Sequence, residues 1–149
     1  MKSKSVWLLS VVIVTAGFAT ACDHVHGHDH SAPPAPSGVN PVQHEMRLLQ
    51  DAMRDTVTAI AAGDVKPVAH ALHKVHGAKE ATGAAIKAGS YKPPKNGDAM
   101  AKFESMDEAF HKDLEGLVEA SSKNDVAGTA AALGKAMSSC NGCHTEFRK

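Results

Sequence analysis

The sequence contains few of the residues that build β-sheets and disulfide-bonded folds. Aromatic residues make up 4% of the 149 residues, with one Trp, one Tyr and four Phe. Because aromatic and β-branched side chains favour strands, their scarcity argues against a sheet and favours an all-α fold. Only three Cys are present. The motifs described below use all of them, so none remains for a structural disulfide.

Neither sign of charge is in excess. Sixteen Lys and Arg residues balance sixteen Asp and Glu residues. A nucleic-acid-binding domain shows a basic patch or a high pI, so we expect no nucleic-acid partner. The inner faces of the predicted helices also lack a general acid–base pair, so we expect no enzyme activity.

Long apolar runs are absent after residue 21. The one such run, residues 6–19, follows two Lys residues and ends in the small residues Ala19-Thr20-Ala21. This order is typical of a bacterial secretory signal, and the run is short of the roughly 20 apolar residues that a membrane span needs. We therefore predict a signal peptide over residues 1–21 and a periplasmic protein. An uncleaved membrane anchor is the alternative.

Cys22 stands immediately after the predicted cleavage site. Its placement resembles a bacterial lipoprotein signal, in which this Cys is lipidated and becomes the new N-terminus. Ordinary cleavage would fall at the same bond, but would leave an exposed, unpaired thiol in an oxidising compartment. We therefore expect a lipoprotein attached to the membrane through Cys22.

Residues 22–41 are predicted to form a tether between the membrane and the domain. They begin with a His-rich segment, Asp23–His30, and continue with the Pro-rich stretch SAPPAPSGVNP. Pro cannot join a helix interior, so this stretch is not part of a helix. The His-rich segment either binds a transition metal or is a solvated linker.

Residues 42–149 carry a helical pattern, because apolar residues recur every three or four positions in four segments. The first segment stops near Gly63, the second spans residues 65–88, and the loop 89–97 is rich in Gly and Pro. Asn124 or Asp125 is expected to cap the fourth segment. Four helices with short connections predict an antiparallel up-down four-helix bundle.

The predicted inner stripes differ in length and composition. They are Met46, Leu49, Met53, Val57 and Ile60; Val65, Val68, Leu72, Val75 and Ile86; Met100, Phe103, Met106, Phe110, Leu114 and Leu117; and Val126, Ala130, Leu133, Met137, Cys140, His144 and Phe147.

One short motif carries chemistry. Cys140-Asn141-Gly142-Cys143-His144 is C-x-x-C-H, the attachment pattern of c-type haem. On a helix the two Cys lie one turn apart, so each thiol can add to a haem vinyl group, and the imidazole of His144 can reach the iron. A redox dithiol would open a helix in a βαβ unit, and a zinc site would need a second pair of ligands. We expect one covalent haem c, with all three side chains on the inward face.

Met46 is the predicted sixth ligand of the haem iron. It lies on the apolar stripe of the first helix, and its thioether is a soft ligand that raises the haem potential. His44 is the rival, but two positions away it points off that stripe.

The C-terminal sequence CNGCHTEFRK resembles the cytochrome c' superfamily, whose members place C-x-x-C-H near the C-terminus, often before Phe-Arg or Tyr-Arg. The chain is also similar to the small periplasmic b-type four-helix cytochrome, with Met46 and His144 at the positions of its axial ligands. The resemblance implies the six-coordinate, low-spin form. It also implies that Phe103 packs on the haem and that Arg148 pairs with a propionate. The b-type protein has a second Phe where this chain has Asp107.

A Met/His iron has no open position, which predicts a one-electron carrier at the periplasmic face of a membrane. Its partners would be periplasmic or membrane redox proteins, engaged through small, transient interfaces. Family members often form dimers, so the resemblance implies a homodimer. The alternative is a five-coordinate haem protein in which Met46 does not ligate. Nitric oxide or carbon monoxide would then bind at an open face lined by Leu49, Met53 and Leu72.

The lipid anchor generates the first prediction. Cys22→Ser removes the thiol that would carry the lipid, so the protein should be released from cells in soluble form. Fractionation of membranes and soluble extract measures this release. A wild-type protein that is already soluble, with a distribution that the substitution does not change, would contradict lipidation and leave ordinary secretion.

Overall fold

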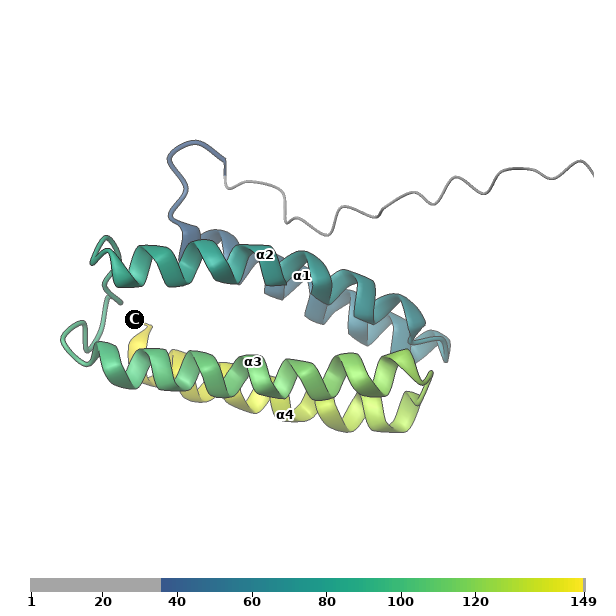
Figure 1. Ribbon diagram of the computed structural model, residues 1–149. Coiled ribbons are helices and arrows are strands. Elements are labelled where there is room, and N and C mark those ends of the chain that lie inside the picture. The colour runs from purple at the N-terminus through teal and green to yellow at the C-terminus, as the bar shows by residue number, and fades with distance from the viewer. Residues whose placement is uncertain (1–35, 149) are drawn as a thin grey trace, which may run out of the picture.

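Four long helices run alternately in opposite directions, as the sequence predicts (Figure 1). The computed structural model describes residues 36–148. Its elements are α1 (Pro41–Ala62), α2 (Lys66–Lys87), α3 (Met100–Ser122) and α4 (Val126–Phe147). The all-α, antiparallel bundle is therefore confirmed, and its first helix begins one residue before the predicted start of the domain. The predicted signal peptide, Cys22 and the His-rich segment lie outside the described residues.

Both ends of α1 carry residues suited to a helix terminus. Asn40 caps the start, because its side chain accepts a hydrogen bond from the Val42 amide at 2.9 Å. Pro41 occupies the first turn, where its missing N–H is no loss. Gly63 ends the helix with φ 73°, a left-handed conformation that glycine adopts at little cost.

Of the two residues predicted to cap α4, only one does so in the structure. Asp125 is the cap, because its carboxylate accepts a hydrogen bond from the Gly128 amide at 2.9 Å. Asn124 instead adopts φ 53° and accepts a hydrogen bond from the Val65 amide at 3.1 Å. This bond ties the α3–α4 turn to the start of α2.

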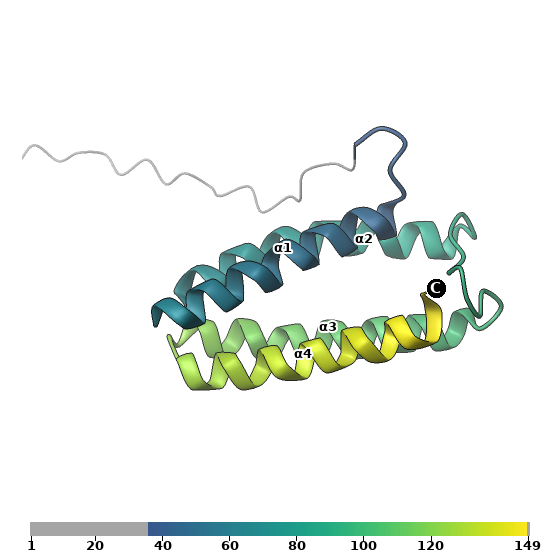
Figure 2. The same ribbon diagram turned by 180° about the vertical axis from the view of Figure 1, so that it is seen from behind.

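The buried side chains form two apolar clusters along the bundle. The larger, which we call the main cluster, draws on all four helices and includes Leu49, Leu72, Phe110, Leu117 and Ala136. The second, the end cluster, consists of Val42, Ile86, Phe103 and Phe147, with Tyr91 and Met106 packed against it. The helices pair as α1 with α2 and α3 with α4, as both views show (Figure 2).

The buried face of α1 is rotated from the predicted one. Met46 and Val57 are 36% and 57% exposed, whereas Glu45 and Thr56 are fully buried. Leu49 and Met53 are buried as predicted. The apolar stripe of a helix spans 100° or more, so neighbouring positions at its edge can exchange places. The sequence pattern predicts that Met46 and Val57 are buried, whereas the structure buries the preceding polar residues, Glu45 and Thr56.

The inner stripe of α4 is also wrong in part. Met137 is 51% exposed, and Ala130 and His144 are exposed as well, whereas Thr129 and Ala136 are fully buried. Because Ala and Gly are frequent along this helix, its apolar periodicity is weak and its facing direction is set by α3. The predicted inner positions of α2 and the positions Phe103, Phe110, Leu114 and Leu117 of α3 are buried as expected.

The loop between α2 and α3 covers the C-terminal end of α4. The Lys95 amide donates to the Phe147 carbonyl at 3.2 Å, and the Lys95 ammonium donates to the Thr145 carbonyl at 2.8 Å. The Asn96 amide group donates to the Glu146 carbonyl at 2.9 Å. The last carbonyls of a helix have no partner within it, so these bonds stabilise the final turn of α4.

Within residues 36–148, none of the helices has both the length and the apolar character required to span a membrane.

The fold generates a prediction that distinguishes the observed faces from the predicted ones. Leu117 is fully buried in the main cluster, so Leu117→Ala should lower the free energy of unfolding by about 2–5 kcal/mol. Met137→Ala should change it by less than about 0.5 kcal/mol, because Met137 is exposed. Denaturant unfolding followed by circular dichroism measures both. If Met137→Ala lowered the free energy of unfolding as much as Leu117→Ala does, Met137 would be a buried residue of α4, as the sequence predicts.

Candidate functional site

The C-x-x-C-H sequence occupies the last turns of α4, at the boundary between the two apolar clusters. Cys140 packs against the main cluster and Cys143 against the end cluster, and both are half-buried. One helical turn separates the two side chains. A group bonded to both sulfur atoms would therefore be attached where the apolar core changes from one cluster to the other.

Aromatic rings line the side of the site that Cys143 faces. The rings of Phe103 and Phe147 meet edge to face with centroids 5.2 Å apart. Tyr91 lies against Phe103 at 5.7 Å. Phe103 is buried as an inner residue of α3, and its contact with a haem remains a prediction. These rings give the end cluster the flat apolar surfaces that suit a macrocycle.

Polar contacts beside Cys140 fix α4 relative to α3. The Ser139 hydroxyl donates to the Asp113 carboxylate at 2.6 Å, and Lys135 forms an ion pair with the same carboxylate at 2.8 Å. The hydrogen bonds from Lys135 and Ser139 hold the pKa of Asp113 below its usual value. The carboxylate therefore stays charged and keeps both contacts at neutral pH.

The environment of the two thiols is unlike that of a reactive dithiol. Burial raises the pKa of Cys140, and burial, the Asp107 charge and Cys140 raise the pKa of Cys143. Redox-active C-x-x-C thiols have a lowered pKa, often at a helix N-terminus, whereas this pair lies near the C-terminus of α4. This difference supports attachment chemistry over disulfide exchange.

His144 is exposed, which corrects the expectation that it lies inside the bundle with both Cys. Partial burial and the neighbouring Arg148 lower its pKa, which favours the neutral imidazole that binds metals. Arg148 is exposed, and its backbone amide donates to the His144 carbonyl at 3.0 Å. The propionate contact of Arg148 and iron ligation by Met46 stay predictions.

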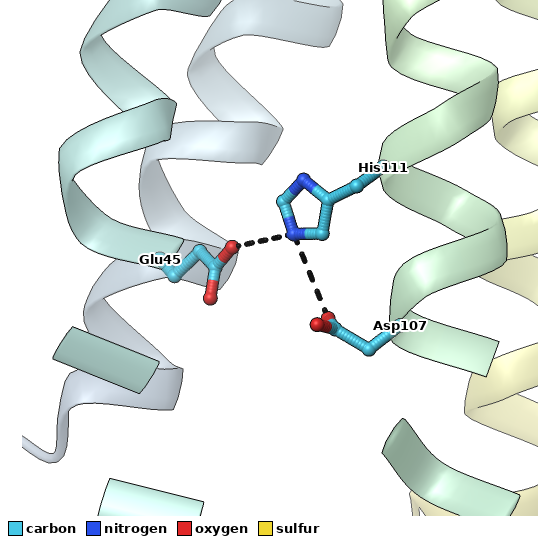
Figure 3. A group of neighbouring side chains, drawn as sticks. All are labelled: Glu45, Asp107 and His111. Atoms are coloured by element: carbon cyan, nitrogen blue, oxygen red, sulfur yellow. Dashed lines mark ion pairs between the residues drawn. The ribbon is translucent and has the colours of Figure 1, made fainter. Parts of the chain in front are cut away.

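A buried polar cluster lies in the bundle interior, and the sequence reasoning missed it. We call Glu45, Asp107 and His111 the interior triad (Figure 3). His111 Nε2 is 3.1 Å from a Glu45 oxygen and 3.7 Å from an Asp107 oxygen. Burial raises the pKa of Asp107, and Glu45 raises it further, against an opposing effect of His111.

Weak sequence signals pointed to this cluster. Asp107 is polar where the similar b-type protein has Phe, and His111 follows it by one helical turn on the inner side of α3. Glu45 precedes the buried Leu49 by one turn of α1. Only the packing of α1 across from α3 shows that the three side chains meet.

The residues present fit a covalently attached haem. The donor set consists of two half-buried thiols one turn apart and an adjacent imidazole, next to an aromatic cluster. These are the groups that form two thioether bonds and one axial bond to iron. Cys140 and Cys143 would hold the porphyrin, and His144 would bind the iron.

The fold and this site define a class of protein: an antiparallel four-helix bundle with a C-x-x-C-H sequence in its last helix. Within that class, the chain is similar to the cytochrome c' family, whose model matches residues 94–148, the part of the chain that contains α3 and α4. No curated protein and no solved structure matches the chain.

The attachment site generates a prediction on the holoprotein. Cys140→Ala or Cys143→Ala should each leave one thioether bond and an unstable holoprotein, and the double variant should release its haem on acid-acetone extraction. His144→Ala should prevent normal assembly, because the axial ligand is lost. Cys22→Ala is the matched control and should keep its haem covalent. Haem that stays covalent in the double variant would refute the assignment.

Proposed function

We propose that this protein is a periplasmic c-type cytochrome that carries one electron on a single covalent haem. The observation that carries the proposal is the position of Cys140 and Cys143. Both half-buried thiols lie at the boundary of two apolar clusters, with His144 beside them. When bound, the haem supplies an iron that alternates between the ferric and ferrous states.

The residues of the chain would hold this group in a rigid and partly apolar setting. The aromatic end cluster limits the access of water on one side, and the contacts of Asp113 with Ser139 and Lys135 keep α4 in place. Rigid surroundings reorganise little when a charge changes, which favours electron transfer over chemistry on a substrate.

The expected setting follows the family. Cytochromes c' are typically periplasmic and generally not enzymes, which supports the predicted export and the absence of catalysis. We propose periplasmic or membrane redox proteins as transient partners and a lipid on Cys22 as the membrane attachment. A homodimer and a propionate contact of Arg148 remain proposals that rest on the resemblance.

The sixth position of the iron divides the two candidate functions. Met46 as a ligand would close that position and favour the carrier. An open position would instead favour binding of nitric oxide or carbon monoxide. The observation that favours this second function is that Met46 is 36% exposed, whereas an axial ligand would point into the bundle. Met46 lies one residue from Glu45 of the interior triad, so it occupies the same level of the bundle.

Replacing Met46 separates the two functions. Met46→Ala should convert the iron from low-spin to high-spin, open it to carbon monoxide and lower the midpoint potential, since a thioether that favours ferrous iron is lost. Absorption spectra of the oxidised, reduced and carbon monoxide-treated protein, with a redox titration, measure these changes.

The control is Met53→Ala, because Met53 is a buried methionine of the main cluster on the same helix. It should cost about 2–5 kcal/mol of stability without changing the spin state. High-spin iron in the wild type would remove Met46 from the site and favour gas binding. A low-spin spectrum in Met46→Ala would also remove Met46, because another residue would then close the sixth position.

A further inference from the structure

The interior triad lies at the level of the bundle where the haem would be attached. Glu45 directly precedes Met46 on α1. Burial raises the pKa of Cys143, and the charge of Asp107 raises it further, so this carboxyl group on α3 lies near the thiol on α4. The three side chains of the triad point toward one another in the bundle interior (Figure 3). A haem bonded to Cys143 would therefore extend into the space that the triad faces.

The buried atoms of the triad are not satisfied by the protein. Both carboxylate oxygens of Glu45 and the Nε2 atom of His111 are buried and have no hydrogen-bond partner among the described residues. Glu45 has 0% of its side chain exposed and His111 has 9%. Buried polar atoms are nearly always paired in native proteins, so these atoms face a group that the chain itself does not supply. The haem is the group that the site predicts in this space, and its porphyrin ring meets them chiefly through charge.

The triad carries a net negative charge. With a neutral imidazole its two carboxylates contribute two negative charges, and a protonated imidazole still leaves one. The remaining charges that act on Asp107 are Lys79 and Glu108, which have opposite signs and offset each other. The haem would therefore lie beside an excess of negative charge.

Negative charge beside a haem changes the balance between its two oxidation states. The iron and porphyrin together carry one net positive charge in the ferric state and none in the ferrous state, so a carboxylate stabilises the ferric state more. A buried carboxylate acts through a medium of low dielectric constant, whereas water and salt screen an exposed one. The interior position of the triad is therefore the feature that gives its charge a large effect.

We propose that Glu45 and Asp107 set the midpoint potential of the haem by stabilising its ferric state. His111 lies between the two carboxylates, 3.1 Å from Glu45 and 3.7 Å from Asp107, and orients them. The inference rests on the proposed haem attachment and deepens it. The charge of the triad lowers the potential, opposite to the effect of a Met46 thioether, and restricts the electron donors to proteins of lower potential.

The experiment removes each charge in the full-length holoprotein and measures the midpoint potential by redox titration. Asp107→Asn and Glu45→Gln should each raise it, because the ferric state loses a favourable interaction. Asp55→Asn and Glu104→Gln are the matched controls, since they make the same chemical changes at exposed positions. Their shifts should be smaller and should vanish at high salt, whereas the shifts of the interior variants should persist.

Two further variants separate charge from structure. Asp107→Glu keeps the charge and should stay close to the wild-type potential. Asp107→Phe removes the charge with an apolar side chain one helical turn from Phe103, so it should raise the potential even if Asp107→Asn fails to fold. Absorption spectra should show the wild-type spin state in the Asp107 variants, which excludes a change of axial ligand as the cause of the shift.

Unchanged midpoint potentials in folded Asp107→Phe and Glu45→Gln would overturn the proposal, as would shifts no larger than those of the exposed controls. Acid-acetone extraction of the wild type tests the proposed function separately. A wild type without covalent haem would refute both proposals, whereas covalent haem with an unchanged potential in the variants would refute only this one.

Discussion

The antiparallel packing of α3 against α4 is the constraint on which the candidate site depends. The bonds of Asp113 to Ser139 and Lys135 set the register of the two helices, and the Phe103–Phe147 contact closes their far end. With that register, Cys140 meets the main cluster and Cys143 the end cluster. The cytochrome c' match covers this same helix pair, which agrees with its role in holding the site.

The C-terminal turn of α4 needs support from outside the helix, because its last carbonyls have no partners within it. The loop between α2 and α3 provides that support through Lys95 and Asn96. The ion pair between Lys102 and Glu146, at 2.9 Å, adds a contact from α3 to the same turn. Residues that are distant in sequence therefore hold the backbone on which His144 sits.

A break in the apolar core accompanies the site. The core of a bundle usually maximises apolar burial, yet here Glu45, Asp107 and His111 meet inside it. Burying an ionised carboxylate costs several kcal/mol unless charge and hydrogen bonds compensate for it, roughly the size of one large core substitution. Natural sequences retain such costs chiefly where a site needs them, and this polar group lies one residue from Met46 on α1.

The sequence by itself determined the number of helices, their boundaries near Gly63 and Asp125, and the attachment motif. Each of these depends on local chemistry: caps, breakers, and the spacing of Cys140, Cys143 and His144. Strongly apolar faces, such as Val68, Leu72 and Val75 on α2, were also predictable, because one direction of burial dominates there. Only the tertiary structure decided the facing of α1 and α4, where Glu45 is buried in place of Met46 and Met137 is exposed. A helix with a broad or weak apolar stripe has several nearly equivalent rotations, and contacts with its neighbours select one of them.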